Sequence, residues 1–152
     1  MQVIRKAKLN DSKDIYALIN SWAKKQRVLE RSLNDIYENI RDFWVCESRG
    51  RVIACCALHV VGWQKLGEIR SLIVHRRHQG KNIGKQLIKK ALVEAKSLGL
   101  TEVFALTFVP GFFKKLKFRN IPKTKLPHKI WSDCVNCVCF PDCTEEAVII
   151  TV

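Results

Sequence analysis

The chain has 152 residues, of which 47% are hydrophobic, so it is long enough to bury the core of one domain. No apolar run reaches the length of a signal peptide or a membrane span, which excludes a membrane-embedded class and predicts a cytoplasmic protein. The formal net charge is +13, but the basic residues are scattered and lack an aromatic-basic recognition motif. A solvated basic surface that attracts anionic ligands is therefore favoured over nucleic-acid binding, and we expect one domain over residues 1–152.

Apolar periodicity predicts strands and helices in the first third of the chain. Residues 2–7 alternate as a strand, and a helix follows after Asn10 or Asp11. Ser32 and Asp35 resemble a capping box that opens a second helix. Residues 43–47 and 51–60 read as strands that a short turn joins into an antiparallel hairpin. The predicted core faces are Ile15, Leu18, Ile19 and Trp22 in the first helix, and Leu33, Ile36, Tyr37 and Ile40 in the second.

Residues 67–98 are the most informative stretch, because a strand, a glycine-containing turn and an amphipathic helix follow one another. Residues 69–74 suit a buried strand, and the turn at 78–84 contains two glycines and Asn82, which tolerate left-handed backbone. Backbone amides at the start of a helix bind anions, and three nearby cations add charge, so the turn predicts a pyrophosphate site. The cations are Arg76, Arg77 and Lys81, and the predicted core face of the helix is Ile83, Leu87, Ala91, Ala95 and Leu98.

The rest of the chain predicts a strand at 101–107, a short helix at 110–116 and a last strand at 147–152. This order of elements, and the turn above, resemble the GNAT N-acetyltransferases. The acetyl-CoA-binding motif of that family is glutamine or arginine, two residues, glycine, one residue, and glycine or alanine. Gln79 and Gly84 match it, whereas Asn82 replaces the usual glycine at the least backbone cost.

The resemblance covers residues 2–118 and implies an α+β fold, with a central mixed β-sheet flanked by helices, and acetyl-CoA as co-substrate. The coenzyme-binding residues that it implies are Leu72, Ile73, Val74, Gln79, Gly80, Lys81, Asn82, Ile83 and Gly84.

Within the family the chain is most similar to the short bacterial N-acetylglutamate synthases. The implied reaction is acetyl transfer from acetyl-CoA to the α-amine of L-glutamate, the entry to arginine synthesis, and the resemblance is compatible with a homodimer. The segments that carry this likeness are 29–32, 40–43, 56–59, 67–71, 104–107 and 126–131.

Glu68 is the candidate base, since several GNAT enzymes carry a base glutamate at the start of this strand. Period-two alternation predicts that it shares a face with Arg70 and Leu72, and an ion pair with Arg70 or a lysine is the structural alternative. The amides around Leu72 and Ile73, near a bulge, are the implied donors to the oxyanion. Phe113 stands where many family members have a tyrosine, so no general acid is assigned.

The implied acceptor is anionic, because Arg31 matches the arginine that holds the α-carboxylate in N-acetylglutamate synthases. No cation stands where longer relatives bind the second carboxylate, so another cation must replace it if the substrate is glutamate. Two alternatives stay open: another amine, such as a peptide N-terminus or an aminoglycoside, and a coenzyme-binding module without catalysis. The implied substrate-binding residues are Leu29, Arg31, Arg70, Ser71 and Lys129, with His128 as a further candidate cation.

Residues 128–143 form a cysteine-rich segment within the domain, with four thiols in the ten residues 134–143. One C-x-x-C has zinc spacing, but the paired, widely separated knuckles of a strong zinc signature are missing. Reduced thiols in a loop under the acceptor pocket are favoured, while structural zinc and a labile disulfide stay open. The candidate zinc ligands are Cys134, Cys137, Cys139 and Cys143, and Cys46, Cys55 and Cys56 are interpreted as small apolar strand residues.

Overall fold

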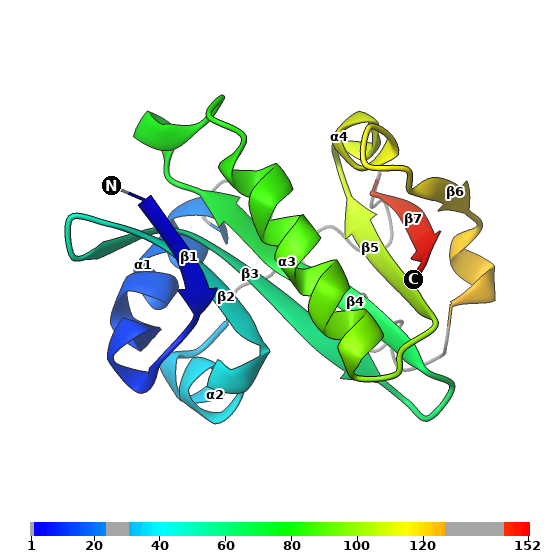
Figure 1. Ribbon diagram of the computed structural model, residues 1–152, viewed down its shortest axis with the longest axis horizontal. Helices are drawn as coiled ribbons and strands as arrows, with labels where there is room; N and C mark the ends of the chain where they lie inside the picture. The colour runs from blue at the N-terminus through cyan, green and yellow to red at the C-terminus, as the bar shows by residue number, and fades with distance from the viewer. Residues whose placement is uncertain (1, 24–30, 127–144) are drawn as a thin grey trace.

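One mixed β-sheet organises residues 2–23, 31–126 and 145–152, the part of the chain that this computed structural model describes. Its seven strands lie in the order β1-β2-β3-β4-β5-β7-β6 (Figure 1). β4 and β5 run parallel, and all other neighbouring strands are antiparallel. The strands are β1 (Gln2–Lys6), β2 (Phe43–Ser48), β3 (Arg51–Val61), β4 (Leu66–Val74), β5 (Glu102–Thr107), β6 (Arg119–Ile121) and β7 (Glu146–Thr151).

Helices cover both faces of this sheet, so the predicted α+β class with a mixed sheet flanked by helices is confirmed (Figure 1). No helix in the described ranges is long and apolar enough to cross a bilayer. The α-helices are α1 (Ser12–Ala23), α2 (Leu33–Glu38), α3 (Ile83–Ser97) and α4 (Pro110–Lys114). Single turns of 3-10 helix are η1 (Leu9–Asp11), η2 (Ile40–Asp42), η3 (Arg76–His78) and η4 (Lys123–Lys125).

The two faces of the sheet have separate apolar cores. α3 lies across one face, where Leu87 and Ala91 pack with Leu58 and Ile69. α1 and α2 cover the other face, whose core contains Ile15, Ile19, Ile36, Phe43, Cys55, Ala57 and Ile73. Alternate residues of β3 and β4 therefore belong to different cores, as period-two alternation requires.

Two predicted core residues are exposed instead. α2 has only six residues, so Ile36 reaches the core while Tyr37, one position further round the helix, faces outward. α3 ends at Ser97, which leaves Leu98 exposed, and the chain turns at Gly99 (φ +88°) to bury Leu100. Both corrections arise because a short helix, or the end of one, presents fewer positions to the sheet than the spacing suggests.

Candidate active site

The sheet opens between β4 and β5. These strands pair only from Leu66 and Glu102 to Ile69 and Ala105. Beyond that point β4 continues to Val74 and β5 to Thr107, but the two strands no longer pair with each other. Figure 1 shows them diverging. The backbone edges that face each other there can bond an extended ligand as a strand would.

A β-bulge in β4 adjoins this opening. The register with β3 passes from Ala57 opposite Arg70 to Cys55 opposite Ile73, so one residue of β3 is matched by two of β4. Ser71 takes a left-handed φ of +52°, and its carbonyl oxygen accepts a hydrogen bond from the Cys55 thiol, at a sulfur-to-oxygen distance of 3.3 Å. Burial raises the pKa of Cys55 to about 12, so this thiol keeps its proton at neutral pH.

The bulge corrects one predicted orientation. Glu68 and Arg70 lie on the same face of β4, as alternation predicted, but Leu72 packs against the α3 core on the opposite face. The extra residue, Ser71, reverses the alternation after Arg70. Leu72 therefore lies away from Glu68, and the prediction that the two share a face is wrong.

The turn after β4 has the predicted bend. Gly80 and Asn82 have φ angles of +80° and +63°, and α3 begins directly after Asn82. No described residue accepts a hydrogen bond from the backbone N–H groups of residues 80–85; the first to be satisfied is that of Gln86, which bonds the Asn82 carbonyl at 3.1 Å. Unsatisfied amides at the positive end of a helix dipole attract an anion.

Side chains hold this turn in place. The Gln79 amide nitrogen donates to the Val74 carbonyl at 3.2 Å, which ties the turn to the end of β4. A Cβ atom at Gly84 would lie 3.4 Å from the Phe112 ring, so the start of α3 is packed closely against α4. Val74, Gln79 and Gly84, three of the predicted coenzyme-binding residues, are therefore brought together with the turn.

The charge around the turn is positive. Arg76, Arg77 and Lys81 are all exposed. Desolvation lowers the pKa of His78, and the neighbouring Lys81, His75 and Arg77 lower it further by electrostatic repulsion. On the α1 side of the turn is a hollow of about 360 Å³, and its lining residues are Leu18, Ser21, Trp22, His75, Arg76 and Arg77. The contribution of α1 to this surface had no local signal in the sequence.

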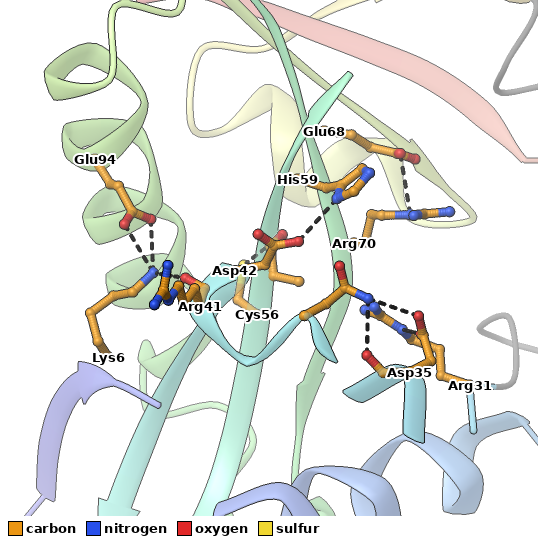
Figure 2. Close-up of polar contacts among 12 residues, drawn as sticks. Lys6, Arg31, Asp35, Arg41, Asp42, Cys56, His59, Glu68, Arg70 and Glu94 are labelled. Carbon is orange, nitrogen blue, oxygen red and sulfur yellow. Dashed lines mark hydrogen bonds and ion pairs between the residues drawn. The ribbon is translucent and has the colours of Figure 1, made fainter. Parts of the chain in front are cut away.

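A polar cluster lies on the α1/α2 face of the sheet beside the bulge (Figure 2). Its members are Glu68, Arg70, His59, Asp42 and, at its edge, Arg31. The Glu68 carboxylate is 3.2 Å from the Arg70 guanidinium, and the Glu68 side chain is only 10% exposed. The ion pair that the sequence offered as the structural alternative to a base role is thus present, and it holds a carboxylate in a largely buried position. A buried carboxylate next to the opening of the sheet has the chemistry of a general base.

Arg31 is held at the edge of the same cluster. Its Nε donates to Asp35 at 2.6 Å, and its guanidinium lies 5.0 Å from the centre of the Phe43 ring. Among the described residues, no acceptor bonds the two terminal nitrogens of this guanidinium. The contacts to Asp35 and Phe43 fix the side chain, and its terminal N–H groups are the pair that can grip a carboxylate.

His59 and Asp42 belong to this cluster, although the sequence analysis did not select either residue. The His59 Nδ1 is 2.9 Å from an Asp42 oxygen, and His59 is directly opposite Glu68 in the register of β3 and β4. The register of the hairpin formed by β3 and β4 is the signal that could have identified His59, because it sets His59 opposite Glu68.

Several sequence predictions fall on residues outside the described ranges: Leu29, His128, Lys129, Cys134, Cys137, Cys139 and Cys143. Within the described ranges, no three His, Cys, Asp or Glu side chains are grouped as metal ligands, and Cys46, Cys55 and Cys56 are buried free thiols. Phe113 is a core residue whose ring centre is 5.1 Å from that of Phe118. A phenylalanine side chain has no acidic proton, so Phe113 has a packing role and not an acid role.

Comparison with known proteins identifies a family and several relatives with similar sequences. A family model described as acetyltransferase (GNAT) family matches residues 10–118. An uncharacterized N-acetyltransferase of Chlorobaculum tepidum is 40% identical over 148 residues, which cover 97% of this chain and 95% of the relative. An amino-acid acetyltransferase of Mycobacterium tuberculosis is 36% identical over 134 residues, covering 86% of this chain and 76% of that protein.

A solved structure is similar over the whole chain. It is a Mycobacterium tuberculosis protein crystallised in complex with CoA and NLQ, with 30% sequence identity and a TM-score of 0.83. The match covers 99% of both chains.

Proposed function

We propose that this chain, which belongs to the acetyltransferase (GNAT) family and is an acetyl-CoA-dependent N-acetyltransferase, acetylates the α-amine of L-glutamate. The product would be N-acetylglutamate, the entry compound of arginine synthesis. The observation that carries the proposal is that Arg31 and Glu68 lie on one face of the sheet, with Glu68 on the strand that borders the opening between β4 and β5.

We assign the coenzyme to the opening and the turn. The unsatisfied amides of residues 80–85 suit its pyrophosphate, and the separated edges of β4 and β5 suit its extended arm. The bound coenzyme supplies an acetyl thioester. Backbone N–H groups of Leu72 and Ile73, just after the bulge, are the donors that we assign to the acetyl oxygen as it gains negative charge.

Glu68 is the base in this proposal. An α-amine is an ammonium at neutral pH and attacks only after it loses a proton, so an acceptor for that proton must lie beside the thioester. Glu68 has the required chemistry and burial, and its carboxylate is held in the ion pair with Arg70. The departing thiolate takes its proton from solvent.

The acceptor's charges match the cations of the site. Arg31 binds the α-carboxylate through its two terminal nitrogens, and the Ser71 carbonyl, which also accepts from the Cys55 thiol, accepts from the amine. Arg70 is the described cation nearest to the base and serves the second carboxylate, a role for which Lys129 and His128 are the alternatives in sequence. Dicarboxylic selectivity follows from this pair of cations.

A panel of acceptors tests the proposal. Release of the coenzyme A thiol is followed with acetyl-CoA and L-glutamate, L-glutamine, L-aspartate, a peptide with a free N-terminus, and an aminoglycoside. We expect the highest kcat/KM with L-glutamate, and no release with N-acetylated glutamate, the control that lacks a free amine. A preference for the peptide or the aminoglycoside would reject glutamate, and release with none of the amines would favour a coenzyme-binding module.

A further inference from the structure

The reaction must dispose of a proton. An ammonium nitrogen that becomes an amide nitrogen gives up two protons, while the coenzyme A sulfur takes up one proton from solvent. The net result is one proton released to bulk water per turnover. Glu68 is poorly placed to release it, because its side chain is 10% exposed and its carboxylate is in an ion pair with Arg70.

His59 has the position of a second proton carrier. It is directly opposite Glu68 on the neighbouring strand, and opposite residues of an antiparallel pair project from the same face. Figure 2 shows its imidazole between the carboxylates of Asp42 and Glu68. Its side chain is 39% exposed, so the ring reaches solvent where Glu68 does not.

Asp42 determines which nitrogen of the ring can act. A carboxylate only accepts hydrogen bonds, so the 2.9 Å contact requires the proton of the neutral ring on Nδ1 and leaves the lone pair on Nε2. The other charged groups drawn beside this ring are Glu68 and Arg70 of β4, whereas Arg31 is turned toward Asp35.

We propose that His59, oriented by Asp42, accepts the substrate proton from Glu68 and releases it to solvent. This inference rests on the proposed acetyl transfer, but not on glutamate as the acceptor. The proton moves from the ammonium to the Glu68 carboxylate, then to Nε2 of His59, directly or through one water. The imidazolium gives it to water or buffer, and neutral His59 and ionised Glu68 are restored. His59 acts through Glu68 and is a positioning and relay residue.

The test compares wild-type protein with His59→Ala, His59→Gln and Asp42→Asn, using whichever amine wild type acetylates best. A missing acceptor for any amine would reject the proposed function, whereas the relay is judged only on the ratios between variants. We expect kcat of both His59 variants to fall on the order of tenfold or more at neutral pH, with an unchanged Kd for acetyl-CoA. Added imidazole should restore much of kcat in His59→Ala, because it supplies the missing base.

Asp42→Asn replaces a group that only accepts hydrogen bonds with an amide that can also donate to Nδ1, so it no longer keeps the lone pair on Nε2. Its kcat should therefore fall several-fold at neutral pH, with an unchanged Kd for acetyl-CoA. Glu38→Gln, an exposed carboxylate of α2 that accepts only from Asn34 among the described residues, is the matched control and should leave both quantities unchanged. A kcat of His59→Ala within twofold of wild type, or a loss that imidazole does not restore in protein with wild-type Tm, would overturn the relay.

Discussion

At the residue scale, Glu68 combines two properties that usually exclude each other: a nearly buried carboxylate and a position next to an opening in the sheet. If it is the base, Glu68→Gln removes proton acceptance while keeping size and a hydrogen-bonding oxygen. We expect kcat to fall about tenfold or more and the Kd for acetyl-CoA to stay within twofold. Steady-state kinetics and calorimetric titration with coenzyme measure the two quantities. Unaltered turnover would remove Glu68 from this role.

Arg31 is predicted to affect acceptor binding rather than chemistry. Arg31→Ala should raise KM for the amino acid on the order of tenfold or more, because a two-point grip on a carboxylate is lost. Arg31→Lys keeps the charge but not the planar fork, so its KM should lie between those of wild type and Arg31→Ala. Stacking on Phe43 also stabilises the fold, so Tm is recorded for both variants. Equal KM values in all three proteins would reject the assignment.

At the scale of elements, the first turn of α3 limits what side chain the coenzyme turn tolerates. Gly84→Leu would push the Phe112 ring, because a Cβ atom added at this position would lie only 3.4 Å from it. The leucine side chain would also crowd the unsatisfied amides. We expect the Kd for acetyl-CoA to rise on the order of tenfold, about 1.4 kcal/mol. Gly111→Leu is the matched control, because a Cβ there meets no atom within 4 Å. Calorimetric titration separates the two, and equal affinities would contradict the assignment.

The elements also show which features were readable from sequence. The hairpin of β2 and β3, the αL conformation of Asn82 and the start of α3 depend on neighbours along the chain, so local spacing predicted them. The face of Leu72 depends on a bulge, which exists only in the register between two strands. The same register places His59 beside Glu68. β6, only three residues long, has too little pattern to be distinguished from a loop.

At the scale of the whole molecule, the two faces of the sheet have different roles. The α3 face is apolar from β3 to β5, and it fixes the helix whose N-terminus presents the amides. The α1/α2 face has an apolar core under Phe43 and a polar cluster beyond it. β4 diverges from β5, and the opening between them connects the two faces of the sheet. A coenzyme in this opening would therefore meet an acceptor held on the α1/α2 side. In the proposed function, the mixed sheet thus brings together two substrates that both carry negative charge.

Stability of this arrangement depends on an ion pair far from the site. Arg5 of β1 donates to both Asp11 oxygens, at 2.8 and 3.0 Å, and the Asp11 carboxylate also accepts from the Lys8 amide. The Arg5 hydrogen bonds are the main cause that lowers the pKa of Asp11 below its usual range. A carboxyl with a depressed folded-state pKa stabilises the protein above its unfolded pKa of about 3.9 and loses that contribution as pH falls through the folded value.

Asp11→Asn should therefore lower the free energy of unfolding by about 1.5–3 kcal/mol at pH 7, since a charged hydrogen-bond network is broken. The difference from wild type should shrink steadily as pH falls below about 4, because protonation of Asp11 makes the wild-type carboxyl neutral as well. Urea unfolding at pH 7 and at pH 3 measures both values. Glu102→Gln, which breaks an exposed pair with Arg119 at 3.6 Å, should cost less than about 1 kcal/mol at either pH. A loss for Asp11→Asn that is equal at both pH values would show that the Asp11 charge contributes nothing to stability.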